Sequence, residues 1–343
     1  MAMRWTSIAC CALLLGLTPL AVAQPSLKGI DLFGTTQITL EQVQKQYGGQ
    51  IQQFARARIS NDTLRTERLK REIESNIHQM GDFAYVKLSL IRSYDPGRPA
   101  YLTIDVVDAK DRESRMRFLP APKGSFPDPE GLLALWDEYM KTGSGLVEKD
   151  ELDFEKMECP AFHCLFGFDH PKLKKFGPIF ASRVPENKAR LIQILQEDRN
   201  AERRACAAFL LAHIQDGQEL VHVLLPSIFD PDESVRNNAM RVLGFISIDH
   251  KELRIPIEPV LEALRFPATT DRNKASFILC GMSDRAEYQK AIIQQGGPVL
   301  LQMLNLSQPN NHDHAYIILR TISGKEFGDR DYEAWEKWLR EYQ

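Results

Sequence analysis

The feature that most constrains the fold is the pattern Arg-x-x-Ala-x-x-x-Leu, which recurs four times in the second half of the chain. The copies begin 32, 36 and 40 residues apart, and each follows an apolar segment. Ala and Leu four apart lie on one helical face, and the small Ala lets a paired helix approach closely. We therefore predict stacked helical hairpins over 186–327, because one hairpin cannot bury its apolar side alone. The copies are Arg204/Ala207/Leu211, Arg236/Ala239/Leu243, Arg272/Ala275/Leu279 and His312/Ala315/Leu319.

The most complete copy, residues 224–246, resembles the HEAT repeat, with matching residues at Asp230, Val235, Arg236, Ala239 and Leu243. In that family an Asp and an Arg six residues apart form a ladder between neighbouring repeats. The spacing is kept by Asp198 and Arg204 in the first copy and by Asp230 and Arg236 in the second. The third copy has Phe266 in place of Asp and the fourth has Leu306, so we expect the ladder to fail toward the C-terminus.

The last segment, 328–343, places Tyr332, Trp335, Trp338 and Leu339 on one helical face. We predict a capping helix, because the open end of a repeat array needs a cover. Two alternatives are a helix lying on a membrane surface and an envelope polysaccharide site built on the pair Trp335 and Trp338.

The N-terminal region, 24–109, is predicted to be a small α+β domain of one strand, two helices and two strands. Thr39 and Gln42 fit a helix-capping box, and a second helix is expected from Asp62. The segment 83–91 alternates one set of side chains with another, which predicts a hairpin with one buried face. The two sets are Tyr85/Lys87/Ser89 and Val86/Leu88/Leu90.

This order of elements, with Gly81, Phe83 and Val86 at the entry to the second strand, resembles a POTRA domain. The other matching residues are Ile30, Gly34, Leu102, Ile104 and Val106. The resemblance implies a docking module that offers a sheet edge to an extended partner segment. Candidate contacts on that edge are Val86, Leu88 and Leu90. The fold class is thus two-domain and mostly α, with an all-α HEAT-like solenoid after the small domain.

Four prolines between 110 and 130 predict a linker, followed by a helical connecting segment over 131–185. That segment contains Cys159, His163, Cys164 and His170. A disulfide between Cys159 and Cys164 is favoured, since Pro160 in the four intervening residues allows a turn. Free thiols, a zinc site, and a reactive thiol with His163 as its base are the alternatives. Cys206 and Cys280 are predicted to be packed, unpaired residues.

The N-terminus, 1–23, has a basic residue, an apolar run from Ile8 to Leu17, and small residues at Ala21 and Ala23. This pattern predicts a signal peptide cleaved after Ala23. The apolar run is too short for a membrane anchor. We therefore expect a periplasmic or secreted protein in an oxidising compartment, where a disulfide persists.

A formal net charge of −3 gives no basic excess for nucleic-acid binding, and neither a membrane span nor a cofactor is expected. Common motifs for serine hydrolases, zinc proteases, dinucleotides and phosphate loops are missing from the sequence. We expect a non-catalytic adaptor that binds proteins, the alternative being an enzyme that uses the Cys159/His163/Cys164/His170 cluster. Candidate contact residues on the inner helices are Asn237, Arg241, Asn273 and Lys274.

Overall fold

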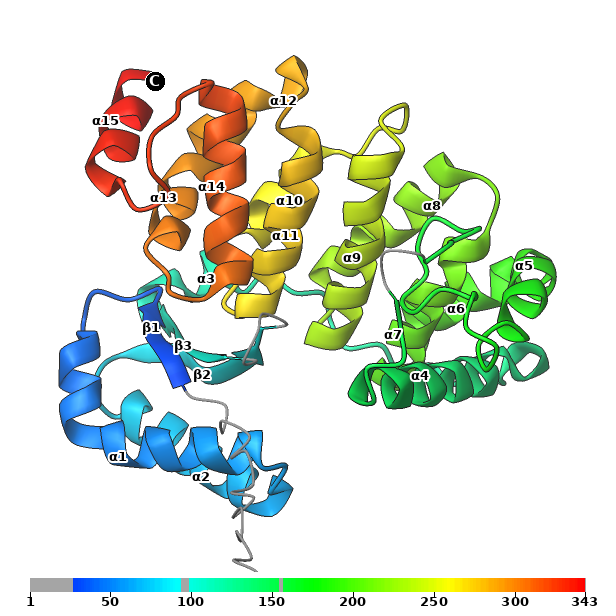
Figure 1. The fold of residues 1–343 in the computed structure, drawn as a ribbon, viewed down its shortest axis with the longest axis horizontal. Helices are drawn as coiled ribbons and strands as arrows, with labels where there is room; N and C mark the ends of the chain where they lie inside the picture. The colour runs from blue at the N-terminus through cyan, green and yellow to red at the C-terminus, as the bar shows by residue number, and fades with distance from the viewer. Residues whose placement is uncertain (1–26, 94–98, 154–156, 343) are drawn as a thin grey trace, which may run out of the picture.

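The computed structural model describes residues 27–93, 99–153 and 157–342 (Figure 1). The predicted signal peptide lies outside these ranges. Within them, no helix combines the length and the apolar character that crossing a bilayer requires.

The N-terminal region forms a three-stranded sheet with two helices, in the predicted order. Strand β3 is central, parallel to β1 and antiparallel to β2. Thr39 and Gln42 make the expected capping box, and the Asp62 side chain caps the second helix. The elements are β1 (Leu27–Phe33), α1 (Leu40–Ile59), α2 (Thr63–His78), β2 (Phe83–Arg92) and β3 (Ala100–Asp108).

Both faces of this sheet are covered, so the expectation of one buried face is wrong. Helices α1 and α2 pack on the face that carries Leu102, Ile104 and Val106. The opposite face, with the fully buried Thr103 and Asp105, lies against the helical repeats (Figure 1). An alternating strand would expose polar side chains such as Thr103 and Asp105 to solvent, but here they contact the helical repeats.

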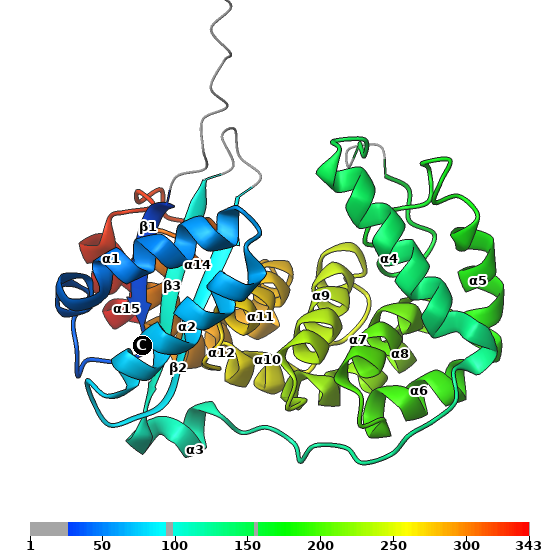
Figure 2. The same ribbon diagram turned by 90° about the horizontal axis from the view of Figure 1, so that it is seen from below.

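The proline-containing stretch is not a separating linker. It contains a helix, α3 (Arg112–Arg115), and an extended segment, residues 116–128, that runs back along the repeats (Figure 2). Leu119 N donates to Phe229 O at 2.7 Å, and Gly124 N donates to Glu197 O at 2.9 Å. The prolines do prevent a longer helix, but tertiary hydrogen bonds hold the extended segment in place.

The helical half begins with α4 and α5, and four hairpins follow, formed by α6/α7, α8/α9, α10/α11 and α13/α14. The short helix α12 lies between the third and fourth hairpins, and α15 follows the last one. The second helices of the hairpins, α7, α9, α11 and α14, stack side by side (Figure 1). Their Ala residues at the fourth position of the pattern are fully buried. The bounds are α4 (Leu132–Glu148), α5 (Phe176–Glu186), α6 (Lys188–Glu197), α7 (Ala201–Leu210), α8 (Gly217–Leu224), α9 (Glu233–Asp249), α10 (Ile257–Ala263), α11 (Thr269–Met282), α12 (Ala286–Ala291), α13 (Gly297–Leu304), α14 (Pro309–Ser323) and α15 (Tyr332–Tyr342).

The C-terminal helix α15 packs against α13 at the end of the array. Trp335 is fully buried, with its ring 5.0 Å from that of Phe327, and its Nε1 donates to Gly328 O at 2.9 Å. Trp338 is partly buried against the same core. A sugar-binding platform or a membrane-surface helix needs exposed rings, and Trp335 is not exposed.

Candidate functional site: the inner helical surface

A ladder of buried arginines connects the repeats. Arg204 donates from Nε and Nη2 to Asp230 at 2.9 and 2.7 Å, and Arg236 donates in the same way to Asp271 at 3.0 and 2.8 Å. Each arginine also donates from Nη1 to the carbonyl six residues before it in its own repeat. Two-pronged contacts of this kind fix both distance and orientation, so the ladder sets the register between hairpins.

The ladder does not fail at the third repeat, contrary to expectation. Asp271, in the first turn of α11, supplies the carboxylate that Phe266 cannot. The next rung is completed from the other domain, where Asp105 of β3 accepts from Arg272 Nη2 at 2.5 Å. At the start of the ladder, the Asp198 carboxylate pairs with Arg203 at 3.1 Å rather than with an arginine of another repeat.

Aromatic rings stack on the guanidinium groups of two ladder arginines, Arg236 and Arg272. The Phe118 ring centroid, in the extended segment, lies 4.2 Å from the Arg236 guanidinium, and the Phe33 ring, on β1, lies 3.8 Å from that of Arg272. Such stacking is favourable where water is excluded. Side chains of the N-terminal sheet and of the extended segment therefore cover Arg236 and Arg272 of the ladder. The N-terminal domain and the helical repeats thus form one packed unit.

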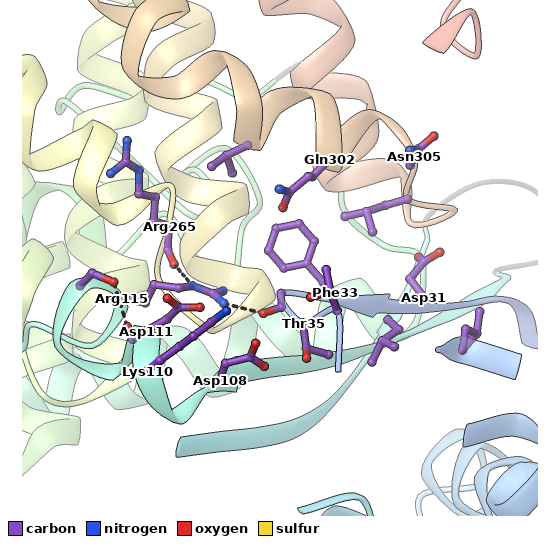
Figure 3. A pocket seen from close by; sticks show the side chains of 17 residues that line it. Asp31, Phe33, Thr35, Asp108, Lys110, Asp111, Arg115, Arg265, Gln302 and Asn305 are labelled. Carbon is purple, nitrogen blue, oxygen red and sulfur yellow. Dashed lines mark hydrogen bonds between the residues drawn. The ribbon is translucent and has the colours of Figure 1, made fainter. Parts of the chain in front are cut away.

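A pocket of about 820 Å³ lies where the two parts meet, between the end of β1 and α13 (Figure 3). The Arg115 side chain donates to Gly34 O and Arg265 O, both at 3.0 Å, and its burial lowers its pKa to about 10. Asp31 accepts from Ser307 N at 2.9 Å. These contacts tie the sheet to the turns that follow α13 and α10, so the lining is part of the domain junction.

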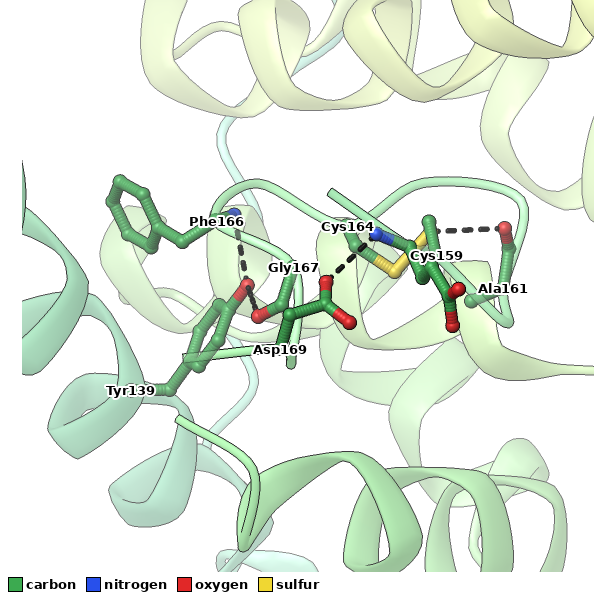
Figure 4. The surroundings of a disulfide bond; sticks show 8 residues. Tyr139, Cys159, Ala161, Cys164, Phe166, Gly167 and Asp169 are labelled. Atoms are coloured by element: carbon green, nitrogen blue, oxygen red, sulfur yellow. Dashed lines mark hydrogen bonds between the residues drawn. A yellow bond between two sulfur atoms is a disulfide. The ribbon is translucent and has the colours of Figure 1, made fainter. Parts of the chain in front are cut away.

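Cys159 and Cys164 form a disulfide, with their Cα atoms 5.4 Å apart (Figure 4). The loop around it is anchored by Phe162 N, which donates to Ala212 O at 3.0 Å. Tyr139 Oη accepts from Phe166 N at 2.9 Å. The zinc and reactive-thiol interpretations both require thiolates, and the bridge consumes these two sulfurs. Within the described ranges, no group of three potential metal ligands is found.

Cys206 and Cys280 are unpaired. Burial raises the pKa of both thiols, that of Cys280 to about 12. At neutral pH they are protonated and weakly nucleophilic.

The second helices of the hairpins line the inner side of the curved array (Figure 2). We call the half-buried side chains there the inner surface. Of the predicted contact residues, Asn237, Arg241 and Lys274 belong to it. Asn273 does not, because it is almost fully buried and its Nδ2 donates to Asn310 O at 2.9 Å. The inner surface comprises Asn237, Arg241, Phe245, Lys274, Phe277 and His314.

A row of aromatic rings crosses this surface from one repeat to the next. His163, from the disulfide loop, stacks on Phe245 at 4.4 Å between ring centroids. Phe245 meets Phe277 edge-on at 5.3 Å, and Phe277 stacks on His314 at 5.8 Å. The disulfide loop is thus part of the inner surface, which sequence reasoning did not anticipate.

Sequence reasoning also missed Phe277 and His314, although the pattern contained a usable signal. Positions two and five after the first residue of the pattern share a helical face. Those positions hold Lys274 and Phe277 in the third copy, and His314 and Ile317 in the fourth. In the second copy the same positions hold Asn238 and Arg241, so this reading would have found part of the surface but not Phe245.

Burial and positive charge both shape the electrostatics of the inner surface. Desolvation lowers the pKa of Lys274 to about 7, with Arg241 contributing, and that of His314 to about 4, with Lys274 contributing. The pKa of His163 falls to about 3 through desolvation and the nearby Arg241 and Lys274. Both imidazoles are therefore neutral at pH 7, and Arg241 and Lys274 are the basic side chains of this partly apolar surface.

The edge of β2 is partly occupied. Leu88 N donates to the Glu74 side chain of α2 at 2.8 Å instead of to a strand. The Leu88 side chain is buried, and those of Val86 and Leu90 pack on the core beneath α1 and α2. Lys87 pairs with Glu233 of α9. The predicted contact side chains on this strand thus pack on the core.

The helical array belongs to the class of α-solenoids. The model of HEAT repeats matches residues 189–275, from α6 into α11, which confirms the HEAT-repeat prediction over that range. No curated protein matches the chain. HEAT repeats indicate a protein-interaction scaffold, because a stacked array presents one long continuous surface.

Proposed function

We propose that this chain is an exported, non-catalytic adaptor that binds other proteins through the inner surface of its HEAT repeats. The observation that carries the proposal is the row of half-buried rings across α9, α11 and α14, with the basic side chains Arg241 and Lys274 beside it. Ile248 and Ile317, exposed by 39% and 46%, extend it with apolar area. Aromatic and basic side chains on a rigid support are typical of binding surfaces.

A second docking site, of the POTRA type, is the edge of β2. Its main-chain groups would pair with an extended segment. Because Leu88 N already donates to Glu74, the partner must displace that carboxylate. We therefore propose that a partner binds the inner surface first and pairs with the β2 edge afterwards.

Export is supported by two independent features. Residues 1–23 have the features of a signal peptide, and the Cys159–Cys164 disulfide is of a kind that persists in oxidising compartments. Fractionation of the producing cell, with N-terminal sequencing of the mature chain, tests this part. A mature protein that starts at Met1 and stays in the cytoplasm would contradict it.

Site-specific photocrosslinking in the producing cell tests the binding proposal. A photoreactive residue replaces Ile317 on the inner side, and a matched one replaces Glu333 on the outside of α15. We expect protein adducts at position 317 and not at position 333. If neither position, or both equally, give protein adducts, the inner surface is not the binding site.

A further inference from the structure

Lys274 is a half-buried basic side chain of the inner surface. Its Nζ donates to Asn273 Oδ1 at 2.7 Å, and within the described ranges no carboxylate forms an ion pair with it. Arg241 on α9, His163 in the disulfide loop and His314 on α14 are the titratable groups whose interaction with it is seen. An ammonium in such surroundings lacks a counter-charge, and a bound anion would supply one.

A second observation also points to a ligand. His163 is only 6% exposed, and its Nε2 has no hydrogen-bond partner among the described residues. A buried polar atom without a partner is unfavourable, because it has lost its hydrogen bonds to water. The ring stacks on Phe245, and Arg241 and Lys274 are near enough to lower its pKa, so the unpartnered ring lies beside the basic part of the inner surface.

The apolar part of the surface indicates what else the ligand carries. Phe245 and Phe277 are half-buried with their edges in contact, and Ile248 and Ile317 lie one helical turn beyond Phe245 and His314. A small inorganic anion would leave this area uncovered. A peptide that alternates acidic and apolar side chains would cover it.

We propose that the inner surface binds a short acidic segment of a protein partner, with a carboxylate at Lys274 and apolar side chains on the rings of Phe245 and Phe277. This inference rests on the proposed function and specifies the chemistry of the partner. Nucleic acid fits less well, because the chain as a whole has a net charge of −3.

Fluorescence anisotropy on the full chain tests the proposal, with a labelled ten-residue peptide of alternating glutamate and leucine as the probe. We expect Lys274→Glu to weaken binding at least tenfold. The matched change Lys290→Glu, at an exposed lysine on α12, should alter it less than twofold. Circular dichroism of both variants verifies that they are folded.

Binding should also weaken as the pH rises from 6.5 to 8.5. An anion favours the protonated form of Lys274, whose pKa is about 7 in the free protein, while His163 and His314 stay neutral throughout. Lys274→Arg should bind the peptide with little pH dependence, because arginine keeps its proton.

Equal binding of a lysine–leucine peptide, equal effects of the two charge reversals, or tighter binding of a single-stranded oligonucleotide would overturn the inference. The crosslinking experiment separates this failure from that of the proposed function. Protein adducts at position 317 that persist in Lys274→Glu leave the adaptor intact and exclude only the acidic segment. A lack of protein adducts at position 317 would contradict the proposed adaptor function.

Discussion

Asp105 of β3 and Arg272 of α11 form an ion pair in which neither side chain is exposed, with 2.5 Å between Oδ1 and Nη2. It joins the sheet to the third repeat in the manner in which one repeat joins the next. The N-terminal domain thus occupies the position of a neighbouring repeat in the arginine ladder.

This pair predicts a strong dependence of stability on Asp105. Asp105→Asn leaves the Arg272 guanidinium buried without a counter-charge, which should lower the free energy of unfolding by about 3–5 kcal/mol. Glu326→Gln, in an exposed pair with Arg320, should change it by less than about 1 kcal/mol. Urea unfolding monitored by circular dichroism measures both. Equal effects would mean that the buried pair does not couple the domains.

The burial of His163 in the row of aromatic rings predicts that the protein loses stability in acid. Its pKa is about 3 in the folded protein and about 6.5 when unfolded. A lowered pKa gives stability that is complete above pH 6.5 and is lost as the pH falls toward 3. His163→Phe, which keeps a stacked ring, should therefore reduce the loss of unfolding free energy between pH 7 and 5 by about 2 kcal/mol.

The exposed His222 offers a control for that measurement. His222→Gln should unfold with the pH dependence of the wild-type protein. If His163→Phe does the same, the imidazole is not held in its neutral form by burial.

The disulfide predicts a specific thiol count. In denaturant without reductant, the chain lacking residues 1–23 should titrate two thiols, Cys206 and Cys280, and after reduction it should titrate four. Closing so short a loop contributes about 2 kcal/mol through chain entropy, so the double change Cys159→Ser and Cys164→Ser should lower stability by that order. Four thiols before reduction would contradict the bridge.

The cap predicts unequal effects of two tryptophans. Trp335→Ala removes a fully buried ring and should cost about 3–5 kcal/mol of unfolding free energy. Trp338→Ala removes a partly buried ring and should cost less. Thermal and urea unfolding measure both. A larger effect at Trp338 would mean that α15 covers the array with a different face.

Local patterns in the sequence determined most of the secondary structure and the repeat architecture. The Thr39 and Gln42 capping box and the recurring Arg, Ala and Leu positions act within one helix or between adjacent ones. A period of 3.6 residues is visible without knowledge of the rest of the chain.

Only the tertiary structure decided which groups meet across long separations. Asp105 and Arg272 are 167 residues apart, and nothing local to either marks it as the other's partner. The contacts of His163 with Phe245 and of Phe118 with Arg236 depend likewise on how loops and layers pack. Packing decides such pairs because a buried group interacts with whatever element lies beside it, and sequence spacing does not specify that neighbour.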